Sequence, residues 1–112
     1  MYFKCCSEKN IILIFDECTS GFRETYGGVH KKYNVIPDLC MFGKALGNGY
    51  AITAVIGTRE IMESAQNTFI SSTFWTERIG PTAGLATLKE MEKVKSWEII
   101  TATGKIIKNN WK

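Results

Sequence analysis

Five consecutive apolar residues, from Ile11 to Phe15, run directly into two carboxylates, Asp16 and Glu17. A continuous apolar run that ends in charge is typical of a strand buried on both faces of a parallel sheet, although a short helix gives the same pattern. A carboxylate beside a dry interior is unfavourable unless a positive group meets it. The run therefore predicts a buried strand and raises the question of which cation Asp16 faces.

The rest of the chain alternates between short apolar runs and helical patterns. Residues 35–44 and 51–57 predict two further strands, because each is a short apolar run with turn-forming residues beside it. Residues 18–34 predict a long loop with a helical turn, and residues 43–49 predict a glycine-rich turn. Helical composition or spacing is found in residues 58–66, in the segment after Gly80, and from Trp97 to Trp111. This order predicts an α/β fold with less than a whole sheet.

The composition excludes several classes of protein. The 112 residues are 45% hydrophobic and 22% charged, as in one globular domain or part of one. No apolar run approaches the ~18 residues that a membrane span needs, and the first ten residues lack the apolar core of a signal peptide. The net charge of +3 comes largely from lysines interleaved with glutamates on predicted helices, which is not a nucleic-acid-binding patch. We therefore expect a cytoplasmic protein that binds neither membranes nor nucleic acids.

The candidate soft metal ligands are four cysteines and one histidine: Cys5, Cys6, Cys18, Cys40 and His30. No C-x-x-C pair is present, so the spacing does not predict a zinc site, and without a secretory signal a disulfide framework is not expected. Cys5, Cys6 and Cys40 are therefore expected to be small apolar fillers, and His30 is expected at the surface. Cys18 lies beside the two carboxylates.

Lys44 offers a cation for Asp16. Asp16 ends the first predicted strand, and Lys44 follows the second, 28 residues later. That separation is enough for a crossover between parallel strands, and ligands of open α/β sheets bind at the carboxyl ends of the strands. If the strands are parallel, both charges emerge at the same edge. The simplest interpretation is a salt bridge or two separate solvated charges.

A nucleotide triphosphatase is a second interpretation, because an apolar strand ending in Asp-Glu resembles the magnesium-binding strand of those enzymes. Such a strand needs a phosphate-binding loop of the form G-x-x-x-x-G-K-[ST]. Here Ala45 follows Gly43 and Lys44 in place of the hydroxyl, and Asp38 stands where the first glycine should be. The loop would also follow the strand instead of preceding it. The sequence disfavours this interpretation.

Pyridoxal phosphate chemistry is the third interpretation. A lysine forms a Schiff base with the cofactor aldehyde, and a carboxylate faces the protonated ring nitrogen, so that the ring accepts electrons from a substrate carbanion. Lys44 and Asp16 would supply these groups, and the lysine must be partly desolvated to be nucleophilic. This interpretation explains why Asp16 lies near the core, because a buried cation would meet it.

Three stretches resemble, in this order and spacing, the class III aminotransferases: LIFDECTSGFRETYGG, PDLCMFGKALGNGY and AVIGTREIM. These are fold-type I pyridoxal-phosphate enzymes and include glutamate-1-semialdehyde aminomutase. The resemblance runs from about Ile11 to about Met91. It implies an α/β fold, part of a large domain with a mostly parallel sheet and covering helices. It also implies pyridoxal 5'-phosphate as cofactor, with a small-molecule amino donor and a carbonyl acceptor.

The resemblance assigns roles residue by residue. Lys44 matches the lysine that holds the cofactor and moves the proton, and Asp16 matches the partner of the pyridine nitrogen. Cys18 falls where the family usually has valine or isoleucine against the ring. Thr73, with Ser72 beside it, matches the position that reaches the cofactor phosphate of the neighbouring subunit, which implies a homodimer.

Other residues of the motifs are expected to be structural. Glu17 is expected to make a structural hydrogen bond. Arg23 is expected to fix its loop through a salt bridge, with binding of a substrate carboxylate as the alternative. Thr19 falls where some members of the family have a glutamine near the ring hydroxyl, and no role is assigned to it.

Family members are several times longer than 112 residues. The resemblance therefore implies that residues 1–112 are a central fragment of the cofactor-binding large domain, without the N-terminal phosphate-loop segment and the C-terminal small domain. Such a fragment buries too little surface to offset its chain entropy, so we expect it alone to be poorly folded and inactive. Aminotransferase activity of the intact enzyme is the prediction. Glutamate-1-semialdehyde 2,1-aminomutase activity is one alternative, and an inactive remnant or binding fragment is the other.

Overall fold

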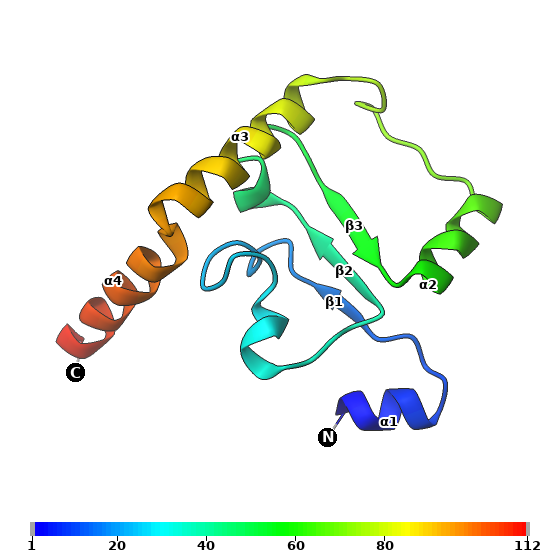
Figure 1. Cartoon of the computed structure of the whole chain (residues 1–112), viewed down its shortest axis with the longest axis horizontal. Coiled ribbons are helices and arrows are strands. Elements are labelled where there is room, and N and C mark those ends of the chain that lie inside the picture. Colours follow the sequence, from blue (N-terminus) through cyan, green and yellow to red (C-terminus); the bar gives the residue numbers. More distant parts are fainter. Residues whose placement is uncertain (1, 112) are drawn as a thin grey trace.

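The computed structural model describes residues 2–111. Figure 1 shows a small sheet with α3 beside it and α4 projecting away from it. The elements in chain order are α1 (Tyr2–Glu8), β1 (Ile14–Asp16), the 3-10 helix η1 (Val29–Tyr33), β2 (Leu39–Phe42), η2 (Lys44–Leu46), β3 (Ala54–Gly57), α2 (Arg59–Ser64), η3 (Ala65–Asn67), α3 (Ile79–Val94) and α4 (Ser96–Asn110).

The three predicted strands form one sheet in the order β1-β2-β3. β1 and β2 are parallel, with Asp16 opposite Met41, whereas β2 and β3 are antiparallel, with Phe42 opposite Ala54. The parallel pair is joined by a long crossover through η1, and the antiparallel pair is joined by the turn over residues 43–53. The α/β prediction is confirmed, and within this part of the sheet the expected parallel pairing holds for β1 and β2 but not for β3.

The core lies around β2 and η2. Cys40, Phe42 and Leu46 are buried, and partly buried apolar side chains pack against them, among them Phe15 and Phe22. The contact between α3 and the chain before β3 depends on small residues of the helix. A Cβ atom added at Gly80 would lie 2.5 Å from the backbone oxygen of Ala51, so a larger residue there would push the helix away.

β1 is less buried than the sequence predicts. Ile11, Ile12 and Ile14 are each about half exposed, although Phe15 packs against the core. β1 is an edge strand with β2 as its neighbour in the described sheet, so part of its apolar surface meets no other strand. The prediction of a strand buried on both faces is wrong for the described residues.

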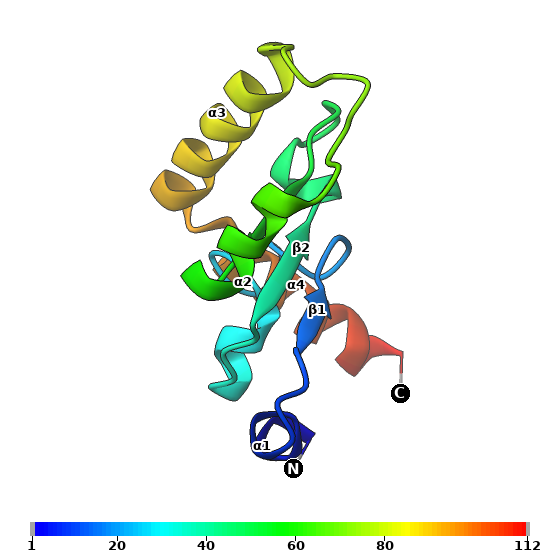
Figure 2. The ribbon, with the colours of Figure 1, turned by 90° about the vertical axis from the view of Figure 1, so that its right-hand side faces the viewer.

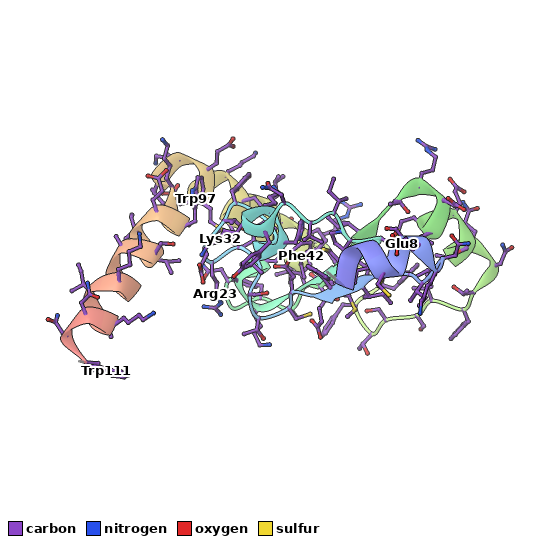
Figure 3. The ribbon with its side chains drawn as sticks, turned by 90° about the horizontal axis from the view of Figure 1, so that it is seen from below. Glu8, Arg23, Lys32, Phe42, Trp97 and Trp111 are labelled. Atoms are coloured by element: carbon purple, nitrogen blue, oxygen red, sulfur yellow. The ribbon has the colours of Figure 1, made fainter. Side chains whose placement is uncertain are left out.

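The predicted helices are confirmed, and the structure adds α1, for which the sequence predicted no element. Figures 1 and 2 place α1 toward one end of the molecule and α3 toward the other. α4 touches the rest of the chain through Trp97, whose ring lies 5.3 Å from that of Tyr26, whereas Trp111 is 87% exposed at the far end of the helix (Figure 3). None of the helices described is long and apolar enough to cross a membrane.

Candidate active site

Asp16 and Lys44 lie at the same edge of the sheet. Asp16 is the last residue of β1, and Lys44 follows Gly43 just after β2, at the start of η2. Because β1 and β2 are parallel, their carboxyl ends point to this edge (Figure 1). Both side chains are exposed. The structure therefore brings together the two charges that the sequence singled out, without the desolvation expected around the lysine.

Thr19 is the hydrogen-bond partner of the Lys44 amine. Nζ of Lys44 donates to Oγ1 of Thr19 at 2.6 Å. The backbone oxygen of Thr19 accepts a hydrogen bond from Nε of Arg23, also at 2.6 Å. In the described part of the chain, this bond takes the place of the salt bridge predicted for Arg23. No local pattern in the sequence indicates this contact, because 25 residues separate Lys44 from Thr19.

The neighbours of Asp16 favour its charged form. The backbone N–H of Cys18 donates to Oδ1 of Asp16 at 3.1 Å. This bond and a second one from the Cys18 side chain lower the pKa of Asp16, with a smaller contribution from the charge of Lys44 and a weak opposing effect of desolvation. The same contact with Asp16 raises the pKa of the Cys18 thiol. The edge therefore presents an anion, with a neutral thiol beside it.

The turn that carries Lys44 uses backbone conformations that most residues avoid. Lys44 has a φ of +39°, and Asn48 and Gly49 have φ values of +47° and +102°. Such a positive φ is costly for a lysine and persists where the surrounding structure imposes it. At Gly47, an added Cβ would lie 2.1 Å from the backbone oxygen of Tyr50, so the turn requires glycine there. The glycine-rich turn predicted for residues 43–49 is confirmed.

A cavity of about 560 Å³ opens beside Lys44. Its size suits a small organic molecule. Asp16 is not among the residues that line it. The lining comes from the loop after β1, the turn after β2, and helices α3 and α4, and includes Phe22, Arg23, Lys44, Asn48, Met91 and Ile100.

Glu17 points away from this edge and is buried, with 2% of its surface exposed. One carboxylate oxygen accepts from the backbone N–H of Val29 at 2.5 Å and from the Ser20 hydroxyl at 3.2 Å. The other accepts from the backbone N–H of His30 at 3.1 Å and lies 2.7 Å from Nδ1 of its ring. Burial raises the pKa of Glu17, but these hydrogen bonds outweigh it and hold the pKa below its ordinary value. This geometry agrees with the structural role predicted for Glu17.

His30 is not the surface residue that the sequence predicted. Its side chain is 14% exposed and closes over Glu17, with its ring edge-on to Phe15 at 6.2 Å. The reason is the crossover between β1 and β2, which carries η1 back onto the sheet. Cys40 is buried as predicted, and both burial and the nearby charge of Glu17 raise the pKa of its thiol.

Ser72 and Thr73 lie away from Asp16 and Lys44. They belong to the segment between η3 and α3, which Figure 1 shows beyond β3, on the side of the sheet opposite β1. Both are exposed, and the Ser72 hydroxyl accepts a hydrogen bond from the backbone N–H of Phe74 at 3.3 Å. Within one chain these residues are therefore not part of the Asp16–Lys44 edge.

Residues 3–112 match the family model described as Aminotransferase class-III. This match covers nearly the whole chain. The chain belongs to the class-III aminotransferase family. The three stretches that carried the resemblance lie around the Asp16–Lys44 edge and the strand next to it.

Two curated relatives in this family have different activities in their names. The chain is 41% identical over 100 residues to 3-aminobutyryl-CoA aminotransferase of Cloacimonas acidaminovorans, covering 88% of this chain and 24% of the relative. It is 42% identical over 88 residues to glutamate-1-semialdehyde 2,1-aminomutase of Methanocaldococcus jannaschii, covering 76% and 21%. The chain thus spans less than a quarter of the length of these relatives.

A solved structure supports the fold of this class-III aminotransferase chain. The FumI protein of Sphingopyxis sp. MTA144, in a form described as the PLP internal aldimine, superposes with a TM-score of 0.75 at 30% identity. The superposition covers 80% of this chain and 22% of FumI. The part of the chain described here therefore has the fold of part of a fold-type I transaminase.

Proposed function

We propose that this chain is the central segment of the large domain of a pyridoxal-phosphate-dependent aminotransferase, with Lys44 and Asp16 as its cofactor residues. The observation that carries the proposal is the parallel pairing of β1 and β2, which brings a lysine and a carboxylate to one sheet edge. The class-III aminotransferase family of this chain and its similarity to the FumI structure, which is described as a PLP internal aldimine form, support the choice of cofactor.

Asp16 and Lys44 match two chemical groups of this cofactor, the ring nitrogen and the aldehyde. The Asp16 carboxylate, whose pKa is lowered, suits a protonated ring nitrogen. The primary amine of Lys44 suits an aldehyde, and Thr19 holds that amine in place. When bound, pyridoxal phosphate supplies a ring that accepts electrons from a carbon next to the amino group.

Each residue then has a distinct task. Nζ of Lys44 would hold the cofactor aldehyde, and the same amine would then be placed to accept and return a proton. Asp16 would face the ring nitrogen and favour its protonated form through its charge. Cys18, in the loop directly after Asp16, would pack against the ring face. Thr73 and Ser72, which lie beyond β3, serve the cofactor phosphate of a second subunit in a homodimer.

A second candidate function is the aminomutase reaction, favoured by the relative from Methanocaldococcus jannaschii. An aminotransferase exchanges an amino group between two molecules, a small-molecule amino donor and a carbonyl acceptor. An aminomutase moves it within one molecule. A requirement for an added amino acceptor in the assay identifies the aminotransferase, and turnover without one identifies the aminomutase.

Covalent labelling tests the proposed role of Lys44. We expect a visible absorption band when pyridoxal phosphate is added to the intact enzyme that contains this chain, and borohydride should then fix the cofactor mass on the peptide that contains Lys44. Lys44→Ala should abolish the reducible adduct. Lys31→Ala, which changes another exposed lysine, should leave it intact. A reducible adduct that survives Lys44→Ala would show that the cofactor lysine lies elsewhere.

A further inference from the structure

Three side chains with metal-binding atoms meet on the sheet face opposite Asp16. Successive side chains of a strand alternate between faces, so Glu17 points away from Asp16 and shares a face with Phe15. Cys40 pairs with Phe15 across β1 and β2 and lies on that same face. η1 brings His30 over it. Figure 2 shows the strands and the neighbouring crossover from the side.

The donor atoms of these residues converge on one small volume. Nδ1 of His30 lies 2.7 Å from Oε1 of Glu17 and 3.4 Å from Sγ of Cys40, and all three atoms lie within 4.8 Å of one another. Glu17 and Cys40 are 2% and 3% exposed. Three donors from three separate segments are thus held together inside the protein, which no motif in the sequence announces.

We propose that Glu17, His30 and Cys40 form a binding site for a zinc-like divalent transition metal ion. Carboxylate oxygen, imidazole nitrogen and thiolate sulfur are the three donor types that Zn²⁺ uses in proteins. With metal–ligand bonds of roughly 2.0–2.3 Å, tetrahedral donors lie about 3.3–3.7 Å apart. The separation of Nδ1 and Sγ already fits, and the separation of Oε1 and Nδ1 has to widen by roughly half an ångström.

The surroundings of Glu17 suit an ion in this place. The ion takes the position of the proton between Oε1 and Nδ1, while the other oxygen keeps its hydrogen bonds from Val29 and Ser20. Such outer hydrogen bonds orient a metal-binding carboxylate. Cys40 releases its thiol proton to water, and His30 binds through Nδ1 with its ring proton on Nε2. The carboxylate and thiolate together balance the two positive charges, so the buried site is neutral.

The ion would join the two parallel strands to the crossover between them. Its free energy of binding would therefore add to the stability of this part of the chain, because the three ligands come together only in the folded state. The site is on the other face of the sheet from Asp16 and is independent of the chemistry proposed for Lys44.

Cobalt absorption tests the site, with Co²⁺ as a coloured substitute for Zn²⁺. We expect the intact protein that contains this chain to bind one Co²⁺ at this site with a sulfur-to-cobalt charge-transfer band, and Zn²⁺ should remove that band. Cys40→Ser should abolish it, and His30→Gln should weaken Co²⁺ binding at least tenfold. The double variant Cys5→Ser/Cys6→Ser, whose changes lie in α1 outside the site, should keep the band.

Direct measurements on the unchanged protein keep the test decisive even if a variant fails to fold. Zn²⁺ should slow alkylation of Cys40, measured by peptide mass spectrometry, and a chelator should reverse the effect. Ser20→Ala, which removes one outer hydrogen bond, should weaken Zn²⁺ binding about tenfold. Absence of the cobalt band in the unchanged protein, or a band that survives Cys40→Ser in folded protein, would overturn the proposal.

Discussion

Asp16 and Glu17 are adjacent carboxylates in very different surroundings. Asp16 is exposed at the sheet edge and is bonded to its own loop, whereas Glu17 is buried and receives hydrogen bonds from the crossover and from Ser20. Hydrogen bonds lower the pKa of both, but on Glu17 they have to overcome burial first. One side of β1 thus keeps an anion available for a ligand, and the other side uses an anion to hold the fold together.

The largest effect on stability is expected at the buried face. Glu17→Ala leaves two backbone N–H groups and the His30 ring without their acceptor, so the free energy of unfolding should fall by about 3 kcal/mol. Urea unfolding of the intact protein that contains this chain, followed by circular dichroism, measures this free energy. Glu92→Ala, on an exposed part of α3, is the matched control and should leave the midpoint unchanged. Equal midpoints for both variants would contradict the anchoring role of Glu17.

At the sheet edge that carries Asp16, a substitution is expected to change activity and not stability. Asp16→Ala should leave the urea midpoint close to that of the unchanged protein, because the side chain is exposed. In the intact enzyme, amino transfer should fall by about a hundredfold or more while part of the cofactor stays bound, because Asp16 is proposed to supply the charge that faces the cofactor ring. Steady-state kinetics and cofactor absorbance measure the two quantities. Full activity of this variant would exclude the role proposed for Asp16.

Gly21 lies in the loop that follows the two carboxylates. A substitution there measures how tightly this loop packs. A Cβ at Gly21 would lie 2.5 Å from the Phe42 ring and 2.8 Å from the backbone oxygen of Glu17. Gly21→Ala should therefore cost about 1–3 kcal/mol in urea unfolding. Gly104→Ala, with no atom near the added Cβ, should be neutral or stabilise α4 by up to about 1 kcal/mol. The reverse order would show that the loop yields easily.

The smallest predicted effect concerns the hydrogen bond between Thr19 and Lys44. Thr19→Val keeps the shape of the side chain but removes the acceptor, so cofactor attachment to Lys44 should slow by roughly fivefold. Thr19→Ser keeps the hydroxyl and should behave like the unchanged protein. Stopped-flow absorbance after addition of pyridoxal phosphate measures the rate. Identical rates for valine and serine would mean that the bond does not position the amine.

The features that sequence reasoning predicted depend on local patterns. The apolar runs predicted β1, β2 and β3, because each strand is a short run of neighbouring residues. The 28-residue separation of Asp16 and Lys44 predicted their shared edge, because it is long enough for a crossover between parallel strands. The antiparallel pairing of β3 was not predicted, since an apolar run does not show its direction. The exposure of Ile14 depends on which neighbours the strand has in the described sheet.

Side-chain contacts across long separations could not be predicted. Thr19 meets Lys44, and His30 meets both Glu17 and Cys40, only because the crossover folds back on the sheet. The sequence did not predict a zinc site, because it has no C-x-x-C pair. Such spacing rules recognise only ligands that are close together in sequence. The residues proposed to bind a metal here are brought together by the topology.

The positive φ of Lys44 affects which residues are favourable at this position. With a φ of +39°, the position would be filled more comfortably by glycine or asparagine if folding alone decided the residue. Lys44→Gly should therefore unfold at a higher urea concentration than the unchanged protein, even as it loses the amine. The presence of lysine at this position is therefore consistent with the cofactor role proposed for its amine. Lineages released from that chemistry should replace it early.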